Sequence, residues 1–211
     1  MKTRSVWLCC TVSAAVLLAG SNGTQAALIP NVTASTNMLT GSGNITNIVN
    51  GSGLPGGIPA LTGTHAFPSA SNTWASGYET GYIIFNLGDS YYVNGISIWP
   101  FHGNSGICVK DIQMLSSTDG SSYTVIPGAP TVLPQGPWAQ PVNPVYYSFP
   151  TITATHIRFN VLSNYGFSTP SGMHSSGFAE VQFDGLPVPE PASLALLTLG
   201  GLAIIRRRRS A

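Results

Sequence analysis

The feature that most constrains the fold of this chain is the alternation of apolar and polar side chains along its middle. Near residue 180, apolar and polar residues follow each other in strict order: Ala179, Glu180, Val181, Gln182, Phe183 and Asp184. Ile157, Phe159 and Val161 mark a second run with the same period. A period of two places side chains on opposite faces of an extended strand. No segment between residues 27 and 187 sustains helical periodicity, so the sequence predicts an all-β domain.

Further short strands are expected where β-branched and aromatic residues cluster, at residues 82–87, 93–99, 107–115, 122–126 and 145–149. Turn-forming sequences separate them, at residues 88–90, 94–95, 119–120 and 127–128. Short strands with frequent turns favour a β-sandwich or jelly roll. Long loops are expected at residues 51–71, 127–144 and 163–176, and such loops on a rigid β scaffold commonly carry binding sites. Trp74 and Trp99 are expected to pack in the core.

The first 26 residues have the composition of a secretory signal peptide. Lys2 and Arg4 precede an apolar run over residues 6–19, and small residues lead to a predicted cut after Ala26, with Ala27 as a near alternative. A transmembrane anchor is the competing interpretation, but the run is short for a bilayer and ends in small polar residues. Signal peptidase is therefore an expected partner, and the chain is expected to be exported.

Residues 188–211 at the C-terminus form three consecutive parts. A Pro-Glu-Pro motif comes first, an apolar stretch follows over residues 192–205, and a basic cluster comes last; the motif and cluster residues are Pro189, Glu190, Pro191, Arg206, Arg207, Arg208 and Arg209. An apolar segment followed by arginines acts as a stop-transfer signal, because arginines resist crossing the bilayer. As a transmembrane helix, the apolar stretch would span about 21 Å, less than the ~30 Å hydrocarbon core. So short an anchor suits a segment that is removed.

This three-part order resembles the PEP-CTERM sorting signal. The resemblance implies that an exosortase, a membrane transpeptidase, processes the chain near the Pro-Glu-Pro motif. It also implies transient anchoring in the inner membrane, followed by placement in the cell envelope or outside the cell. The expected source is a Gram-negative-type bacterium that makes extracellular polysaccharide.

Charge in the predicted mature domain, residues 27–187, argues against a nucleic-acid partner. The domain keeps only Lys110 and Arg158 against six acids, which leaves a formal charge of −4. Nucleic-acid binding needs clustered positive charge. Arg158 is expected to pair with an acid on a neighbouring strand. Cys108, the single cysteine of the domain, is expected to be a buried thiol, with intermolecular pairing as the alternative.

A series of short motifs across the domain resembles the discoidin family, the galactose-binding-like jelly roll. The motifs follow the order of that family at residues 33–36, 47–51, 72–76, 84–88, 93–98, 116–123, 155–159 and 177–183. The resemblance covers about residues 31–185 and implies a discoidin-like jelly-roll β-sandwich. The chain departs from the family pattern at Asn50, where aspartate is usual, and in the long loop between Gly51 and Asn72.

The same resemblance implies a structural Ca²⁺ site between the loop before Trp74 and the last strand. By position, Asn50, Asn72 and Glu180 would supply side-chain oxygens, the ligand type that Ca²⁺ prefers. Only Glu180 is anionic, so a modest affinity is expected. The alternative is an ordinary turn at residues 50–51 and a solvated strand residue at Glu180.

Candidate sugar-contacting residues lie in the expected loops: His102, Asn104, Trp138, Tyr165 and His174. Sugar recognition uses an aromatic face against C–H groups, together with amide or imidazole groups that hydrogen-bond hydroxyls. The alternative is that the aromatic side chains cover the ends of the core and that the histidines are surface residues.

No catalytic motif is found: the sequence has no Gly-x-Ser-x-Gly, no His-Glu-x-x-His and no glycine-rich phosphate loop. We therefore expect an exported, non-enzymatic protein that binds carbohydrate of the envelope or of an exopolysaccharide (biofilm) matrix. A structural matrix or adhesion protein that binds proteins or itself is the alternative, and a matrix-glycan hydrolase is the third hypothesis. Apart from Ca²⁺, no cofactor is expected.

Overall fold

The computed structural model describes residues 26–166 and 174–189. These residues form strands and short 3-10 helices in the following order: β1 (Thr33–Thr36), β2 (Thr40–Gly43), η1 (Ile45–Ile48), η2 (Pro55–Gly57), β3 (Trp74–Ser76), β4 (Gly81–Pro100), η3 (Ser105–Ile107), β5 (Ile112–Ser117), β6 (Thr124–Val125), β7 (Val145–Val161) and β8 (Gly177–Pro187). The predicted all-β class is confirmed. Within these ranges, no helix has the length and apolar character needed to cross a membrane. The signal segment up to residue 25 and the predicted transmembrane helix at 192–205 lie outside the described residues.

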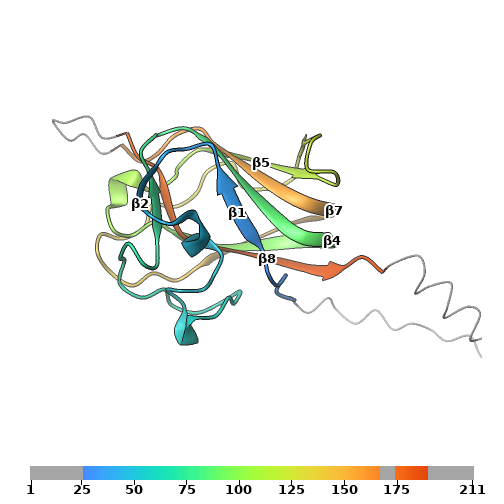
Figure 1. Ribbon diagram of the computed structural model, residues 1–211, viewed down its shortest axis with the longest axis horizontal. Coiled ribbons are helices and arrows are strands. Elements are labelled where there is room, and N and C mark those ends of the chain that lie inside the picture. Colours follow the sequence, from blue (N-terminus) through green and yellow to red (C-terminus); the bar gives the residue numbers. More distant parts are fainter. Residues whose placement is uncertain (1–25, 167–173, 190–211) are drawn as a thin grey trace, which may run out of the picture.

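Two long bent strands, β4 and β7, contribute to both layers of the sandwich (Figure 1). In one layer, the first part of β4 lies between β1 and the last part of β7. The other edge of β7 pairs with β5, and β5 pairs with β6. In the other layer, the last part of β4 lies between the first part of β7 and β8, followed by β3 and β2. All pairings between these strands are antiparallel, as expected for a jelly roll.

The bends in these strands replace turns that the sequence predicts. Residues 88–90 do not end a strand; Gly88 has a φ of 83°, and the β4–β7 register shifts between Asn86 and Tyr91. A second register shift follows between Val93 and Gly95. Because a bulge inserts extra backbone without breaking the strand, a turn-forming sequence here produces a bend. The strand expected at 107–115 begins only at Ile112, after η3.

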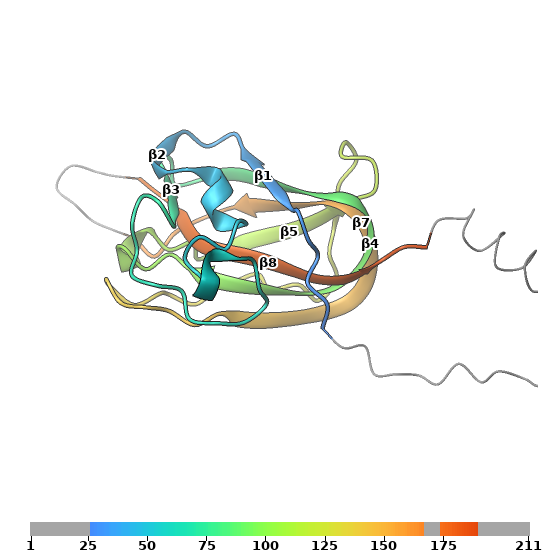
Figure 2. The same cartoon turned by 60° about the horizontal axis from the view of Figure 1, so that its bottom comes forward.

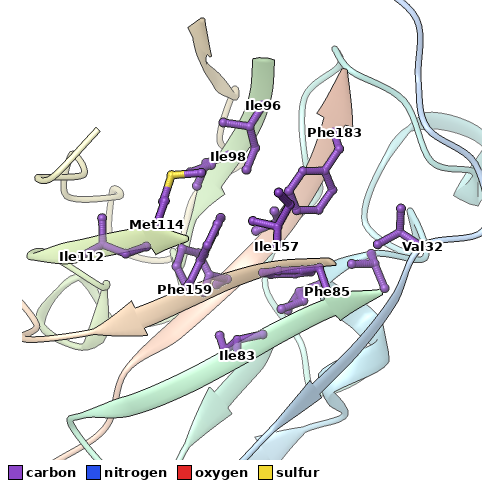
Figure 3. Close-up of a cluster of buried hydrophobic side chains, with 14 of the residues drawn as sticks. Val32, Ile83, Phe85, Ile96, Ile98, Ile112, Met114, Ile157, Phe159 and Phe183 are labelled. Atoms are coloured by element: carbon purple, nitrogen blue, oxygen red, sulfur yellow. The ribbon is translucent and has the colours of Figure 1, made fainter. Parts of the chain in front are cut away.

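The apolar core lies between the two layers and is centred on aromatic side chains (Figure 3). The ring centroid of Phe85 on β4 lies 4.8 Å from that of Phe159 on β7 and 5.1 Å from that of Phe183 on β8. Trp74 and Trp99 are fully buried, as predicted. The domain thus has a hydrophobic core of its own, which is what an independently folding domain needs.

β8 is buried on both of its faces, although its sequence alternates apolar and polar residues. Residues 45–73 and the N-terminal segment cover the face that carries Glu180, Gln182 and Asp184 (Figure 2). Side chains of the neighbouring β4 hold this cover in place, since Ser97 Oγ donates to the Leu61 carbonyl at 2.6 Å and Trp99 Nε1 to the Gly63 carbonyl at 2.8 Å. The alternative of a solvated strand residue at Glu180 is therefore wrong.

Arg158 packs against aromatic rings, whereas Cys108 is buried against backbone. The Arg158 guanidinium lies 4.1 Å from the ring centroid of Tyr82 and 5.7 Å from that of Tyr123, so it pairs with aromatic faces rather than with the expected acid. Cys108 is a buried thiol, as expected, and its Sγ donates to the Phe101 carbonyl at 2.6 Å. Burial raises the pKa of this thiol to about 11, which keeps it unreactive.

Candidate binding groove

A groove of about 590 Å³ opens at the end of the sandwich where β3 ends and β8 begins. Its lining comes from strands β2 and β3 and from three loops: Gly41, Ser42, Ala75, Ser76, Gly77, Tyr78, Asn104, Ile107, His174 and Ser175. A second hollow of about 300 Å³ adjoins it and shares Ser42, Ala75, Asn104 and Ile107. Each volume lies within or close to the usual range of small-ligand sites, about 300–1,000 Å³.

Ser76 at the end of β3 fixes one wall of the groove. Its buried hydroxyl donates to the Tyr78 carbonyl and accepts from the Ser176 N–H at 3.1 Å. These bonds hold the segment after β3 against the segment before β8. Tyr78 is consequently presented at the rim, with 52% of its surface exposed. Gly41 allows this close packing, because a Cβ there would lie 2.8 Å from the Ser76 carbonyl oxygen.

Asn104 faces the groove from the loop between β4 and β5. Its Oδ1 accepts from the Gly106 N–H at 2.9 Å and caps the 3-10 helix η3. The side chain is thereby oriented, and its Nδ2 donates to nothing in the described parts of the chain. An oriented amide with a spare donor is suited to a ligand hydroxyl.

His174 and Glu79 form an ion pair at the groove, with 3.2 Å between Nδ1 and Oε2. Their side chains are 74% and 38% exposed, so both remain accessible. The Glu79 backbone is fixed by Ser176, whose hydroxyl donates to the Glu79 carbonyl at 2.5 Å. The pair is charged when His174 is protonated, and it then offers both a donor and an acceptor with little net charge.

The structure brings together two of the five sugar-contacting candidates, Asn104 and His174. Tyr165 supports the floor instead: it is half-buried against the cluster of Ala75, Phe101 and Cys108, and its hydroxyl donates to the Leu133 carbonyl at 2.6 Å. Trp138 is 56% exposed but is not part of the lining. Its loop is attached to the β4–β5 loop through the Ala139 N–H, which donates to the His102 carbonyl at 2.7 Å.

His102 corrects the sequence-based expectation, because it has no exposed surface and lies in the interior. Its Nε2 lies 3.0 Å from Nδ1 of His65, another fully buried histidine, and its Nδ1 lies 2.5 Å from the Gln140 carbonyl. His65 Nε2 in turn lies 3.0 Å from the Asn72 carbonyl. The two imidazoles therefore join three loops beneath the groove rather than contact a ligand.

Counting protons shows what this buried pair requires. Two neutral imidazoles carry one N–H each, whereas the contacts from Asn72 through His65 and His102 to Gln140 need three protons to be hydrogen bonds throughout. Burial nevertheless disfavours the extra charge, and it lowers the pKa of His102 to about 4 and that of His65 as well. At neutral pH one of these contacts is therefore a meeting of two acceptors.

Two of the three predicted Ca²⁺ ligands, Asn50 and Asn72, use their side-chain oxygens in turns of their own loops. Asn50 Oδ1 accepts from the Ser52 N–H at 2.9 Å, and Asn72 Oδ1 accepts from the Ser69 N–H at 2.7 Å, so each closes a turn of its own loop. In the described ranges, no group of three His, Cys, Asp or Glu residues is placed to hold a metal ion.

Glu180 alone keeps a feature that fits a cation. Its Oε1 accepts from the Gly51 N–H at 3.1 Å and from Gln182 Nε2 at 2.5 Å, while its buried Oε2 has no partner. Gln182 Nε2 also donates to the Val49 carbonyl at 3.0 Å, so this amide lies between the Val49 carbonyl oxygen and Glu180 Oε1. The Ca²⁺ site thus stays a prediction, now centred on Glu180 Oε2.

Sequence reasoning missed Tyr78, Glu79 and the buried partner His65. For Tyr78 and Glu79 a signal is present, because an aromatic residue and an acid follow Gly77 in a chain that carries little charge. For His65 no local signal exists, since its partner lies 37 residues away.

Comparison with known protein families gives two matches. The model of the F5/8 type C domain matches residues 31–173, and that of the PEP-CTERM protein-sorting motif matches residues 187–209. No curated protein sequence matches the chain.

Solved structures with a similar fold include carbohydrate-binding modules. A family 32 module from Clostridium perfringens, in complex with galactose, superposes with a TM-score of 0.53 at 16% identity and covers 76% of this chain and 99% of its own. Another module from that organism, in complex with GalNAc-beta-1,3-galactose, gives 0.51 at 17% identity, with 75% and 99% coverage. The C-terminal domain of a Bacteroides fragilis chitobiase gives 0.50 at 15% identity, with 78% and 100% coverage. At these identities the likeness establishes the fold.

Proposed function

The chain belongs to the F5/8 type C domain family, and from this premise we propose that it is a non-catalytic protein that binds carbohydrate in the groove between Tyr78 and Asn104. The sorting motif at residues 187–209 indicates export and exosortase processing, with placement in the cell envelope or outside the cell. The ligand we propose is a polysaccharide of the cell envelope or of an exopolysaccharide matrix.

The observation that carries this proposal is an exposed tyrosine beside polar groups that the backbone holds in place. Tyr78 offers a face for the C–H groups of a sugar ring, and its phenol remains at the wet edge of the groove. Asn104 offers an oriented Nδ2 donor, and Glu79 offers carboxylate acceptors. Sugar hydroxyls both donate and accept, so they complement a site of this mixed kind.

The charge at the groove favours a neutral sugar. Glu79 and His174 compensate each other when the histidine is protonated, and the lining residues are otherwise uncharged. Neither a phosphate nor a uronic acid finds a cluster of cations among the described lining residues. Galactose and GalNAc-beta-1,3-galactose are the first ligands to test, because relatives of the same fold hold them.

The scarcity of acids near the groove favours non-catalytic binding over hydrolysis. Glycoside hydrolysis ordinarily requires a pair of carboxyl groups, about 5–10 Å apart, on either side of the scissile bond. Among the described lining residues and their hydrogen-bonded neighbours, Glu79 is the single acid. Product release from a polysaccharide, abolished by Glu79→Gln, would contradict this part of the proposal.

The experiment is glycan-array and calorimetric binding with the domain of residues 27–189, in Ca²⁺ and in EDTA. Tyr78→Ala and Asn104→Ala should each weaken binding at least tenfold, because each removes a ligand-facing group without touching the core. Tyr92→Ala is the matched control, since this exposed tyrosine pairs with Leu186 at the other end of β8. Unchanged affinity in both groove variants would place the sugar elsewhere. A folded domain that binds no glycan but self-associates with rising concentration would support a structural role.

A further inference from the structure

Ala27, the first residue of the predicted mature domain, contacts a buried acid. The backbone N–H of Ala27 donates to Oδ1 of Asp184 at 2.6 Å. The Ala27 carbonyl accepts from the Gly185 N–H at 2.8 Å, and the Ile29 N–H donates to the Phe183 carbonyl at 2.9 Å. Leu28 therefore bridges antiparallel to Asp184, and the segment extends the cover over the last part of β8 (Figure 2).

Asp184 is a carboxylate that lacks a positive partner in its surroundings. Only 2% of its surface is exposed. Its second oxygen, Oδ2, accepts from the Tyr146 hydroxyl at 2.7 Å. In the described parts of the chain, the two ion pairs are Lys110 with Asp111 and His174 with Glu79, so no cationic side chain pairs with Asp184. A buried carboxylate is costly unless its charge is compensated.

The surroundings of Asp184 are built to admit these two donors. A Cβ on Gly95 would lie 2.1 Å from the Tyr146 hydroxyl oxygen, so only glycine allows that hydroxyl to cross β4 to reach Asp184. A Cβ on Gly185 would lie 2.6 Å from the Tyr92 carbonyl oxygen and 2.9 Å from Ile29 Cδ1, so this glycine allows β8 to pack closely against both β4 and the N-terminal segment. The carboxylate thus has two prepared contacts, one of which is the nitrogen of Ala27.

We propose that the α-ammonium group created at Ala27 by signal-peptide cleavage is the missing cation, and that it forms an ion pair with Asp184 which only the processed chain possesses. In the cleavage, water adds across the Ala26–Ala27 peptide bond. The C–N bond breaks, Ala26 departs with a carboxylate, and the Ala27 nitrogen is protonated to an ammonium. A neutral amide donor thereby becomes a charged one at the same position, and charge-assisted hydrogen bonds are about twice as strong.

This inference also selects between the two cleavage positions that the sequence leaves open. A cut after Ala27 would remove both the nitrogen that contacts Asp184 and the carbonyl that accepts from Gly185. A cut after Ala26 keeps both contacts and adds the charge. The structure therefore assigns Ala27 as the first residue of the mature protein.

The test compares three forms of the domain that begin at residue 26, 27 or 28 and all end at residue 189, made by a protease that leaves no extra residue. The forms beginning at 26 and 27 carry the same net charge, but only the second places the ammonium against Asp184. We expect its Tm to be higher by roughly 3–8 °C, and the form beginning at 28 to melt lowest. Asp184→Asn should remove most of the difference between the first two forms.

Equal Tm values for the forms beginning at 26 and 27 would overturn the proposal, and so would a difference that persists undiminished in Asp184→Asn. The comparison of the two parent forms stands even where Asp184→Asn does not fold. As an independent readout, the intact mass of the exported protein should correspond to a first residue of Ala27. A mass corresponding to Leu28 would contradict the assigned cut.

Discussion

The two faces of β8 are equally buried but are stabilised in different ways. The inner face presents Phe178, Val181 and Phe183 to an apolar core, where contacts depend on volume and are not directional. The outer face presents Glu180, Gln182 and Asp184, whose side chains are held by specific hydrogen bonds from or to Gly51, Val49, Tyr146 and Ala27. The comparison teaches that burial alone does not define a core: one face needs filling, and the other needs satisfied hydrogen bonds.

The largest effect is expected on the inner face. Phe183→Ala removes a fully buried ring that packs against Phe85, and it should lower the free energy of unfolding by about 3–5 kcal/mol, because the lost apolar contact leaves a cavity. Urea unfolding monitored by fluorescence measures this. Phe67→Ala, at a side chain that is 64% exposed, is the control and should stay within about 0.5 kcal/mol of the parent.

On the outer face, Gln182→Leu tests satisfied hydrogen bonds at nearly constant volume. The change leaves the Val49 carbonyl and Glu180 Oε1 without their shared donor, so a loss of about 2–3 kcal/mol is expected. The exposed Gln113→Leu provides the control. If Gln182→Leu were as stable as the parent, the two faces would not differ in the way proposed, and the outer face would behave as an ordinary apolar layer.

Glu180 sharpens the comparison, because it is the residue whose hydrogen bonding is incomplete. Burial raises the pKa of Glu180 to about 7, above its ordinary value near 4.5. The folded carboxyl therefore keeps a proton that the unfolded chain has lost, and stability falls as pH rises from about 4.5 to 7. Glu180→Gln should abolish this fall and stabilise the domain at pH 8 by about 1–3 kcal/mol, with little change at pH 4.

The predicted Ca²⁺ site provides a second test of the Glu180 carboxyl. If Ca²⁺ binds at Oε2, adding it at pH 8 raises the Tm of the parent but not of Glu180→Gln, and EDTA reverses the gain. A Tm that responds equally in parent and variant, or in neither, removes Glu180 from the predicted metal site.

The smallest effect is expected at the groove, which contributes to neither face. Glu79→Gln breaks an exposed ion pair with His174 and should change stability by less than about 0.5 kcal/mol. Thermal melts at low and high salt would show whether even this small effect is screened. A large loss would mean that the groove residues hold the sandwich together, contrary to their exposure.

Local patterns in the sequence predicted the strands of this fold better than the burial of both faces of β8. Period-two alternation correctly indicated β8, but alternation does not reveal that a distant segment covers the polar side. That cover depends on bonds such as Trp99 to Gly63, which link residues far apart in the sequence. Gly88 indicated a turn because a positive φ serves a turn and a bulge equally well.

The candidate site was only partly predictable for the same reason. Asn104 and His174 were found because their residue types suit sugar recognition. His102 has the same chemistry but points to His65 in the interior, and Trp138 lies beside the groove rather than in it. Residue type gives chemical capability, whereas the direction in which a side chain points depends on how distant loops pack.

Both ends of the described domain leave it at the same pole. Ala27 lies beside Asp184 near the end of β8, and the Val188 N–H, at the start of the sorting motif, donates to the Ser90 carbonyl at 2.9 Å. The groove lies beyond the opposite end of β8, and a strand of 11 residues extends about 36 Å at ~3.3 Å per residue. If the sorting segment tethers the chain to a membrane, as the proposed function requires, the groove lies at the end of the domain away from the tether. The proposed polysaccharide ligand could then be bound before an exosortase releases the chain.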